Sequence, residues 1–332
     1  MKDPGAAIML ELLIGGVLIV GCSMTGTQPV RQSVEEWNDL KLWYNRPAQK
    51  WTEALPVGNG RLGAMVFGTV ETERLQLNED TLWAGQPTER DRVGAYQHLA
   101  EARRLIFEGK YTEGQKIMQQ EFMGPRLIRS YQTLGDLQLR FQGGRAITGY
   151  RRQLDLDTAI ASVKYRAGDA TFTREVFSSP VDQCIVVRLS CDKPAQITFD
   201  ANLSRPEDFV VETIAPDRIV MKGQATQQSE HKGVRFEAQL RIIPEGGKLT
   251  ATDKGLRLEN ADAATLLIVA ATDYQGDNPE AVCGRQFAFA GRKSYLELQQ
   301  AHVAEHRRLF RSVVMNLGPA DAADKPTDER LV

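Results

Sequence analysis

The sequence predicts a mostly β protein: a large antiparallel β-sandwich of two sheets, with a helical insertion and a C-terminal linker helix. Two observations support this prediction. Short segments of alternating apolar and polar residues, separated by Gly, Asp, Asn and Pro, follow one another from residue 136 to residue 274. Apolar residues at helical spacing occur in one stretch before this region and one after it. Eight strands at this spacing favour an antiparallel sandwich over a βαβ fold.

The composition is that of an ordinary globular protein. The 332 residues are 42% hydrophobic and 25% charged, so the chain can bury a core and is long enough for one large β domain with an extension, or for two domains. The net charge of −2 and the lack of a basic face give no footprint for nucleic acid, and no nucleic-acid partner is expected.

The N-terminus, residues 1–22, predicts a lipoprotein-type signal peptide. The apolar run Leu12–Val20 is too short to span a bilayer but suits a signal-peptide core. The following "IVGCS" resembles the lipobox of bacterial lipoproteins, in which Cys22 is lipidated and anchors the protein to the membrane. We therefore expect export to the bacterial cell envelope, as an outer-membrane lipoprotein or in the periplasm, with residues 23–38 as a polar tether. An unlipidated signal peptide and a buried hydrophobic segment are the alternatives.

The segment "VGNGRLGAMVFG" places Gly58, Gly60 and Gly63 at the spacing of a dinucleotide-binding turn. Such a turn must follow a buried strand and open a helix. Here prolines and charges precede the glycines, and the strand-like alternation of residues 64–78 follows them. The glycines therefore predict a tight turn or a close backbone approach, and no nucleotide cofactor.

Helices are predicted in two places. Residues 94–122 have helical spacing and are divided by Gly109 into two helices. Residues 292–318 form the second helical stretch, with Gly318 and Pro319 expected to end it. Its apolar positions are Leu296, Val303, Phe310 and Val313 or Val314.

Eight strands are predicted between these helices, at residues 136–141, 161–167, 170–179, 183–190, 196–203, 218–225, 233–243 and 265–274. Cys184 and Cys191 fall on one of them, on the order of 23 Å apart at ~3.3 Å per residue and on opposite faces, so they are expected to be core residues rather than a disulfide. With Cys22 lipidated, Cys283 is the remaining cysteine.

The C-terminal helix contains "HVAEH", His302–His306, which has the H-x-x-E-H pattern of an inverted zinc-peptidase motif. A zinc site needs a third protein ligand, and no downstream residue is singled out for that role. We expect packing or surface histidines and no metal.

The segment "LQLNEDTLWAGQP", residues 75–87, is the candidate binding site. A strand ends at Asn78, and Glu79, Asp80, Thr81 and Trp83 follow closely. Carboxylates bind sugar hydroxyls and an indole ring stacks on a sugar face, so the loop suits a carbohydrate. All four tryptophans lie in the first 83 residues, which predicts aromatic surface near this loop. Alternatively, the rings fill the core and Glu79 or Asp80 caps a turn.

Several motifs occur together in one order: "LWYNRPAQKWTEALPVGNGRLGAMVFG", "ERLQLNEDTLWAG", "YQTLGDLQLRF", "YRRQLDLDTAIASVKY", "TREVFSSPVDQCIVVRLS" and "PTDERL". From about Leu42 to the last residue, the chain resembles the N-terminal half of glycoside hydrolase family 95, whose best-known members are inverting α-L-fucosidases.

This resemblance implies a β-sandwich at residues 39–291 and a helical linker at 292–332, followed in such enzymes by an (α/α)6 barrel that carries the catalytic carboxylates. The glycans that the whole enzyme binds would be fucosylated or related. No catalytic residue is then expected in this chain, which alone would be inactive, and no cofactor is expected. The resemblance implies that Asn59, Glu79, Thr81 and Trp83 form part of the wall of the sugar pocket. The alternatives are a non-catalytic, lipid-anchored carbohydrate-binding or scaffold module, or another hydrolase or phosphorylase with a related sandwich.

Overall fold

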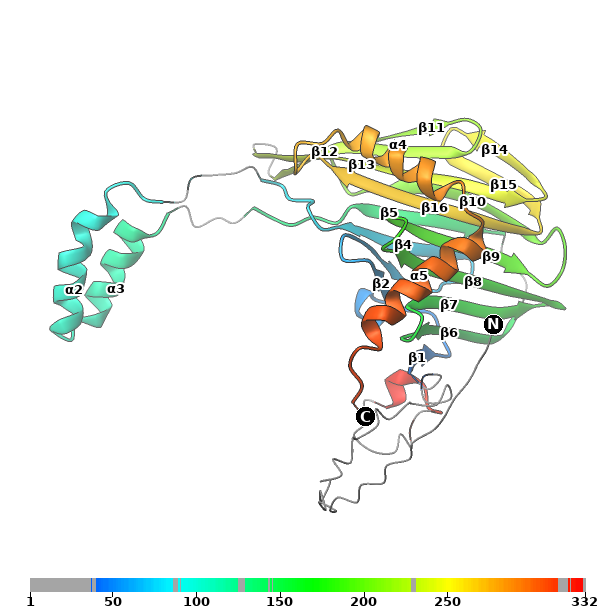
Figure 1. Cartoon of the computed structure of the whole chain (residues 1–332), viewed down its shortest axis with the longest axis horizontal. Coiled ribbons are helices and arrows are strands. Elements are labelled where there is room, and N and C mark those ends of the chain that lie inside the picture. Colours follow the sequence, from blue (N-terminus) through cyan, green and yellow to red (C-terminus); the bar gives the residue numbers. More distant parts are fainter. Residues whose placement is uncertain are drawn as a thin grey trace, which may run out of the picture.

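The structure, a computed structural model, describes residues 37, 40–85, 89, 91–124, 129–142, 144, 146–227, 231–315, 322 and 324–330. These residues form two antiparallel sheets packed face to face, with helices on one outer face (Figure 1), which confirms the predicted fold class. The predicted signal peptide, Cys22 and nearly all of the tether lie outside the described residues.

The first sheet of the described chain has nine strands in the order β1-β6-β7-β8-β9-β16-β13-β12-β11. They are β1 (Lys41–Tyr44), β6 (Ile147–Asp155), β7 (Ile160–Ala167), β8 (Ala170–Ser179), β9 (Cys184–Cys191), β16 (Ala263–Thr272), β13 (His231–Glu245), β12 (Arg218–Gln227) and β11 (Phe209–Ile214).

The second sheet of the described chain has seven strands in the order β14-β15-β10-β5-β4-β3-β2. They are β14 (Lys248–Thr252), β15 (Gly255–Ala261), β10 (Ile197–Ser204), β5 (Gly135–Phe141), β4 (Thr72–Glu79), β3 (Leu62–Val66) and β2 (Leu55–Gly58).

The pattern of burial along the strands explains the layers. In β10 every second residue is buried, because one face packs on the core and the other is partly exposed. In β16 every residue is buried. Leu266 and Ile268 point into the core between the sheets, whereas Leu267 and Val269 pack beneath the C-terminal helices. The continuous apolar run of β16 therefore reflects a strand that is covered on both faces.

All eight strands predicted after the helical insertion are confirmed as β5, β7, β8, β9, β10, β12, β13 and β16, whereas the remaining strands other than β3 and β4 were not predicted. The alternating stretch after Gly63 is divided at Gly68 into β3 and β4. Gly68 has a φ of 76°, and a Cβ there would lie 2.7 Å from the hydroxyl of Tyr150. Glycine is required at this turn because other residues rarely adopt such a positive φ.

The helical insertion is confirmed as two helices, α2 (Leu99–Phe107) and α3 (Tyr111–Ile117). The short helical segment η2 (Ala95–His98) precedes α2, and η3 (Met118–Phe122) follows α3. Gly109 lies between the helices with a φ of 75°, which ends α2 in the way expected of a glycine. The hairpin is inserted between β4 and β5 and stands clear of the sandwich (Figure 1).

Two helices, rather than one, cover the outer face of the nine-stranded sheet: α4 (Pro279–Ala290) and α5 (Tyr295–Phe310). Helix α4 was not predicted, although Asn278 caps it and Pro279 occupies its first turn. Helix α5 begins with a capping box formed by Ser294 and Glu297. The remaining helical turns of the described chain are η1 (Trp51–Glu53) and η4 (Thr327–Glu329).

The predicted end of α5 is wrong, and its predicted apolar face is confirmed only in part, because Val303 packs against the buried cluster beneath the helix. The helix ends at Phe310, and Arg311 after it binds the buried carboxylate of Asp157. Leu296 and Val313 are exposed. The buried face instead carries Leu298 and His302. Simple apolar periodicity missed this face because one of its anchors is an imidazole. Within the described residues, no helix has the length and apolar character needed to cross a membrane.

The prediction for the strand cysteines is confirmed. Cys184 packs beneath the helices and Cys191 contacts the core between the sheets, so the two side chains point to opposite faces of β9. Both are free thiols, as is Cys283, which is buried in α4. Burial raises the pKa of the Cys184 and Cys283 thiols, which favours inert core residues.

Candidate functional site

The glycine-rich segment is the hairpin turn between β2 and β3. The side-chain Oδ1 of Asn59 accepts hydrogen bonds from the backbone N–H groups of Arg61 and Leu62 at 3.0 and 2.8 Å. Gly60 has a φ of 91°, and a Cβ on Gly63 would lie 3.0 Å from the carbonyl oxygen of Val57. A strand follows the glycines, which confirms the prediction of a tight turn with close backbone approach.

Asn59 also joins this turn to the other sheet, because its Nδ2 donates to the carbonyl of Ser179 at 3.0 Å. All of these bonds lie within the protein. The structure therefore places Asn59 as the residue that shapes the turn and presents its neighbour Arg61.

Arg61 ties four chain segments together at one end of the sandwich. Its Nη1 donates to Glu79 Oε1 at 3.3 Å and to the carbonyl of Ala270 at 2.7 Å. Its Nε donates to Gln183 Oε1 at 2.9 Å. The ends of β4 and β16 and the β8–β9 turn thus meet at one guanidinium. Arg61 was not predicted as a site residue, although it lies inside the glycine motif.

Glu79 is the buried carboxylate beside Arg61 at this end of the sandwich. Its Oε2 accepts from the backbone N–H of Thr81 at 2.8 Å and from the Thr81 hydroxyl at 2.7 Å, so it caps the turn that follows β4. The Thr81 hydroxyl also contacts that of Thr272 at the end of β16. Burial raises the pKa of Glu79, with the bonds from Thr81 and the charge of Arg61 acting against it and the charge of Asp80 adding to it.

A cavity of about 340 Å³ opens beside these residues. Its lining includes Arg61, Glu79, Asp80, Thr81, Tyr274 and Gln286. The Oε1 of Gln286 is buried and has no hydrogen-bond partner among the described residues. The cavity has the size of a small-molecule site, and its carboxylates, hydroxyls and amide can both donate to and accept from a polar ligand.

Trp83 follows the cavity residue Thr81 by two positions but does not itself line the cavity. Its residue is 39% exposed, and its ring is tilted by 58° against Tyr131 with 5.1 Å between the ring centroids. The Tyr131 hydroxyl bonds the side chain of Asn78 and the carbonyl of Glu79, each at 2.8 Å. An exposed aromatic pair therefore flanks the acidic loop, and the alternative that Trp83 fills the core is wrong.

The expectation that the tryptophans gather near this loop is wrong for two of them. The Trp37 ring contacts Phe310, the last residue of α5, and the Trp43 ring lies 4.1 Å from the guanidinium of Arg151 on β6. The aromatic neighbour of Trp83 is Tyr131, which lies 48 residues later in sequence. Only the pairing of β4 with β5 brings them together.

The two histidines of the H-x-x-E-H motif face the protein backbone. His302 Nε2 lies 3.0 Å from the carbonyl oxygen of Thr158, and His306 Nε2 lies 2.8 Å from that of Leu156. Because a carbonyl only accepts, both Nε2 atoms carry a proton. The His302 ring stacks on Phe177 at 4.7 Å, and burial lowers its pKa, which favours the neutral imidazole of a packing residue. No group of three or more His, Cys, Asp or Glu in the described part of the chain is arranged to hold a metal ion.

Comparison with known proteins identifies the chain's family. The sequence profile described as "Glycosyl hydrolase family 65, N-terminal domain" matches residues 42–277. "Alpha-L-fucosidase 2" from Arabidopsis thaliana is 31% identical over 92% of this chain, and "Probable alpha-fucosidase A" from Aspergillus niger is 29% identical over 87%. The chain spans 41% and 39% of the lengths of these two relatives.

The matching profile is that of glycosyl hydrolase family 65, whereas the sequence motifs resemble those of family 95. The two agree that this is the N-terminal part of a glycoside hydrolase, and the relatives are named as fucosidases. The profile covers well over half of the chain. The chain therefore belongs to the glycosyl hydrolase family 65 N-terminal domains.

Proposed function

We propose that this chain is the β-sandwich part of an α-L-fucosidase-like glycoside hydrolase of the family-95 type. Its cavity end would form part of the sugar pocket of a helical barrel that carries the catalytic carboxylates. The observation that supports this most is the cavity beside Glu79 and Thr81, flanked by the exposed ring of Trp83. Polar acceptors next to an aromatic face are the usual means of holding a sugar. The names of the relatives supply the sugar class, fucosylated or related glycans.

The roles in this proposal differ between residues. Glu79 and Thr81 would face the sugar from the cavity, while Trp83 would stack on its apolar face. Asn59 would act indirectly, by shaping the turn that presents Arg61 to Glu79. None of them would be the general acid or base. Inverting hydrolysis needs carboxyl groups on opposite sides of the sugar, roughly 6.5–9.5 Å apart. Glu79 is the immediate neighbour of Asp80 and is already bonded to Arg61 and Thr81.

The test is a chimera in which this chain replaces the matching part of the Arabidopsis relative. The assay is release of fucose from an α-1,2-fucosylated oligosaccharide. We expect no turnover by the chain alone and turnover by the chimera. Trp83→Ala in the chimera should weaken substrate binding by ~1–3 kcal/mol, the range for removal of an apolar group from a binding pocket. Trp51→Ala is the matched control, because Trp51 is also exposed but lies in η1, away from the cavity lining.

Turnover by the isolated chain at the rate of the chimera would refute this division of labour. An unchanged KM in the Trp83 variant would show that this ring does not contact the substrate. If the isolated chain binds the oligosaccharide but no chimera cleaves it, the chain acts as a carbohydrate-binding module instead. We also propose that Cys22 anchors the protein to the bacterial envelope, on the evidence of the "IVGCS" sequence.

A further inference from the structure

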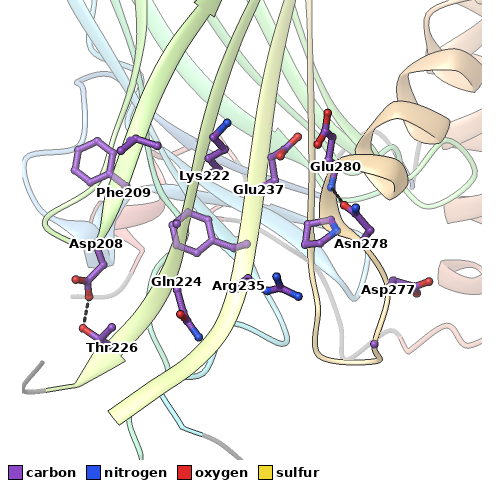
Figure 2. A pocket seen from close by; sticks show the side chains of 15 residues that line it. Asp208, Phe209, Lys222, Gln224, Thr226, Arg235, Glu237, Asp277, Asn278 and Glu280 are labelled. Atoms are coloured by element: carbon purple, nitrogen blue, oxygen red, sulfur yellow. Dashed lines mark hydrogen bonds between the residues drawn. The ribbon is translucent and has the colours of Figure 1, made fainter. Parts of the chain in front are cut away.

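A second groove lies on the outer face of the nine-stranded sheet, beside the N-terminal half of α4. It consists of two adjoining hollows of about 700 and 530 Å³. Both are lined by Lys222, Glu237, Asn278 and Glu280. Figure 2 shows the tips of Lys222, Glu237 and Glu280 pointing toward the same side of the sheet.

The groove exists because α4 covers only part of this face. The helix packs on β16 and β13 and leaves the outer surface of β11 and β12 open. On β11 every second residue is exposed, including Val210 and Ile214. Lys222 is the cross-strand neighbour of both Val210 and Glu237, so all three share the open face. The floor is thus a charged row with apolar residues at its edge.

The groove contains a buried acceptor without a donor. Gln239 is 4% exposed, and its Nε2 donates to Glu237 Oε1, which fixes the orientation of the amide. Its Oε1 is then directed away from Glu237 and has no hydrogen-bond partner among the described residues. A buried carbonyl in this state is unfavourable, and a ligand that donates a hydrogen bond would relieve the cost.

There is room for such a ligand above Gln239. Gly284 of α4 lines the same hollow, and a Cβ placed on it would meet no atom of the described chain within 4 Å. The glycine is exposed and lies in the interior of a helix, where it is less favourable than other residues. Its absent side chain keeps the groove open.

We propose that this groove is a second carbohydrate-binding site, separate from the cavity beside Glu79. The groove presents acceptors on Gln239, Glu237 and Glu280 together with the donor of Lys222, which pairs with Glu212 at 3.2 Å. Hydroxyl groups both donate and accept, so a neutral sugar matches this mixture better than an anion or a cation does. Val210 and Ile214 would contact its C–H groups. The sugar class rests on the proposed function, whereas the groove and its unpaired acceptor do not.

The test uses the full chain and an α-1,2-fucosylated lactose oligosaccharide, with binding measured by saturation-transfer NMR and calorimetry. Gly284→Leu fills the groove and improves helix propensity, so it should fold and bind at least tenfold more weakly. Arg285→Leu is the matched control, one residue along the same helix and outside the groove lining. Gln239→Leu removes the unpaired acceptor and should also weaken binding.

Trp83→Ala separates this inference from the proposed function. Loss of binding in the Gly284 and Gln239 variants, with residual binding in Trp83→Ala, supports the groove. Binding that is lost in Trp83→Ala and unaffected by Gly284→Leu overturns the groove and leaves the proposed function standing. If the native chain binds no oligosaccharide, the proposal of a second sugar site is wrong. The proposed function is then tested separately by fucose release from the chimera. Displacement of the sugar by methylguanidinium would show that the groove binds cations, and would also contradict the proposal of a sugar site.

Discussion

Replacement of Arg174 by methionine should be among the most destabilising single changes in the sandwich. Arg174 on β8 and Glu73 on β4 form an ion pair between the two sheets, and both side chains are 3% exposed. The Arg174 Nη1 donates to Glu73 Oε2 at 3.0 Å, and Nη2 donates to the carbonyl of Val70 at 2.6 Å. The guanidinium also lies 4.0 Å from the centre of the Phe141 ring.

The magnitude follows from this geometry. Two unit charges 3.0 Å apart attract by about 5.5 kcal/mol at an effective dielectric constant of about 20. Much of that attraction offsets the cost of burying both ions, so the pair adds little net stability compared with apolar residues. Removal of Arg174 alone leaves the Glu73 carboxylate buried without its cation, which costs about 3–5 kcal/mol.

The assay is urea unfolding followed by circular dichroism, on Arg174→Met, Glu73→Leu and the double variant. The double variant should recover most of the stability lost by either single variant, because no charge remains buried. Arg308→Ala is the control, since Arg308 pairs with Glu305 on the exposed side of α5 and should cost less than about 0.5 kcal/mol. A loss below about 1 kcal/mol for Arg174→Met, or additive losses in the double variant, would refute the reasoning.

Four further predictions concern other parts of the chain. The free energy of unfolding should fall as the pH drops through about 6.5, because burial lowers the folded-state pKa of His302 and the unfolded chain therefore takes up a proton first. Urea unfolding of His302→Gln should show a weaker pH dependence than that of the native chain. An identical pH profile for the two proteins would contradict this prediction. Zinc should not bind the motif with micromolar or tighter affinity, and calorimetric binding that His306→Ala abolishes would show otherwise. Labelled palmitate should be incorporated in bacteria by the native chain and not by Cys22→Ala; equal labelling of both, or of neither, excludes lipidation. Gly63→Val should destabilise by about 1–3 kcal/mol in urea unfolding, because its Cβ would press on the carbonyl of Val57, whereas Gly58→Ala has more room and should cost less.

The sequence was sufficient for the fold because alternation and turn residues are local signals. It placed eight of the strands that follow residue 135, and the helical hairpin with Gly109 at its turn. It missed strands such as β6, whose first residues are exposed and show little alternation. It also missed α4, although Asn278 and Pro279 mark its start.

The sequence predicted only those residues of the candidate site that are close neighbours along the chain. Glu79, Thr81 and Trp83 are neighbours in sequence, so their clustering is a local property. Arg61 and Tyr131 come to the same place through the pairing of β4 with β3 and β5, which depends on strand register. Composition and periodicity carry no information on register between distant strands. The inward-facing histidines of α5 were not assigned to its buried face for a related reason, since that face depends on contact with the β6–β7 turn.

The loop around Trp83 is positioned by main-chain atoms. The N–H of Val234 donates to the carbonyl of Trp83 at 3.2 Å, and a Cβ on Gly233 would lie 2.0 Å from that same oxygen. Any side chain at position 233 would therefore push the loop away, whereas side chains within the loop take no part in this contact. The exposed side chain of Trp83 could therefore be exchanged while this main-chain contact keeps the loop in place. The position of the Trp83 main chain thus depends in part on one glycine 150 residues later in the chain.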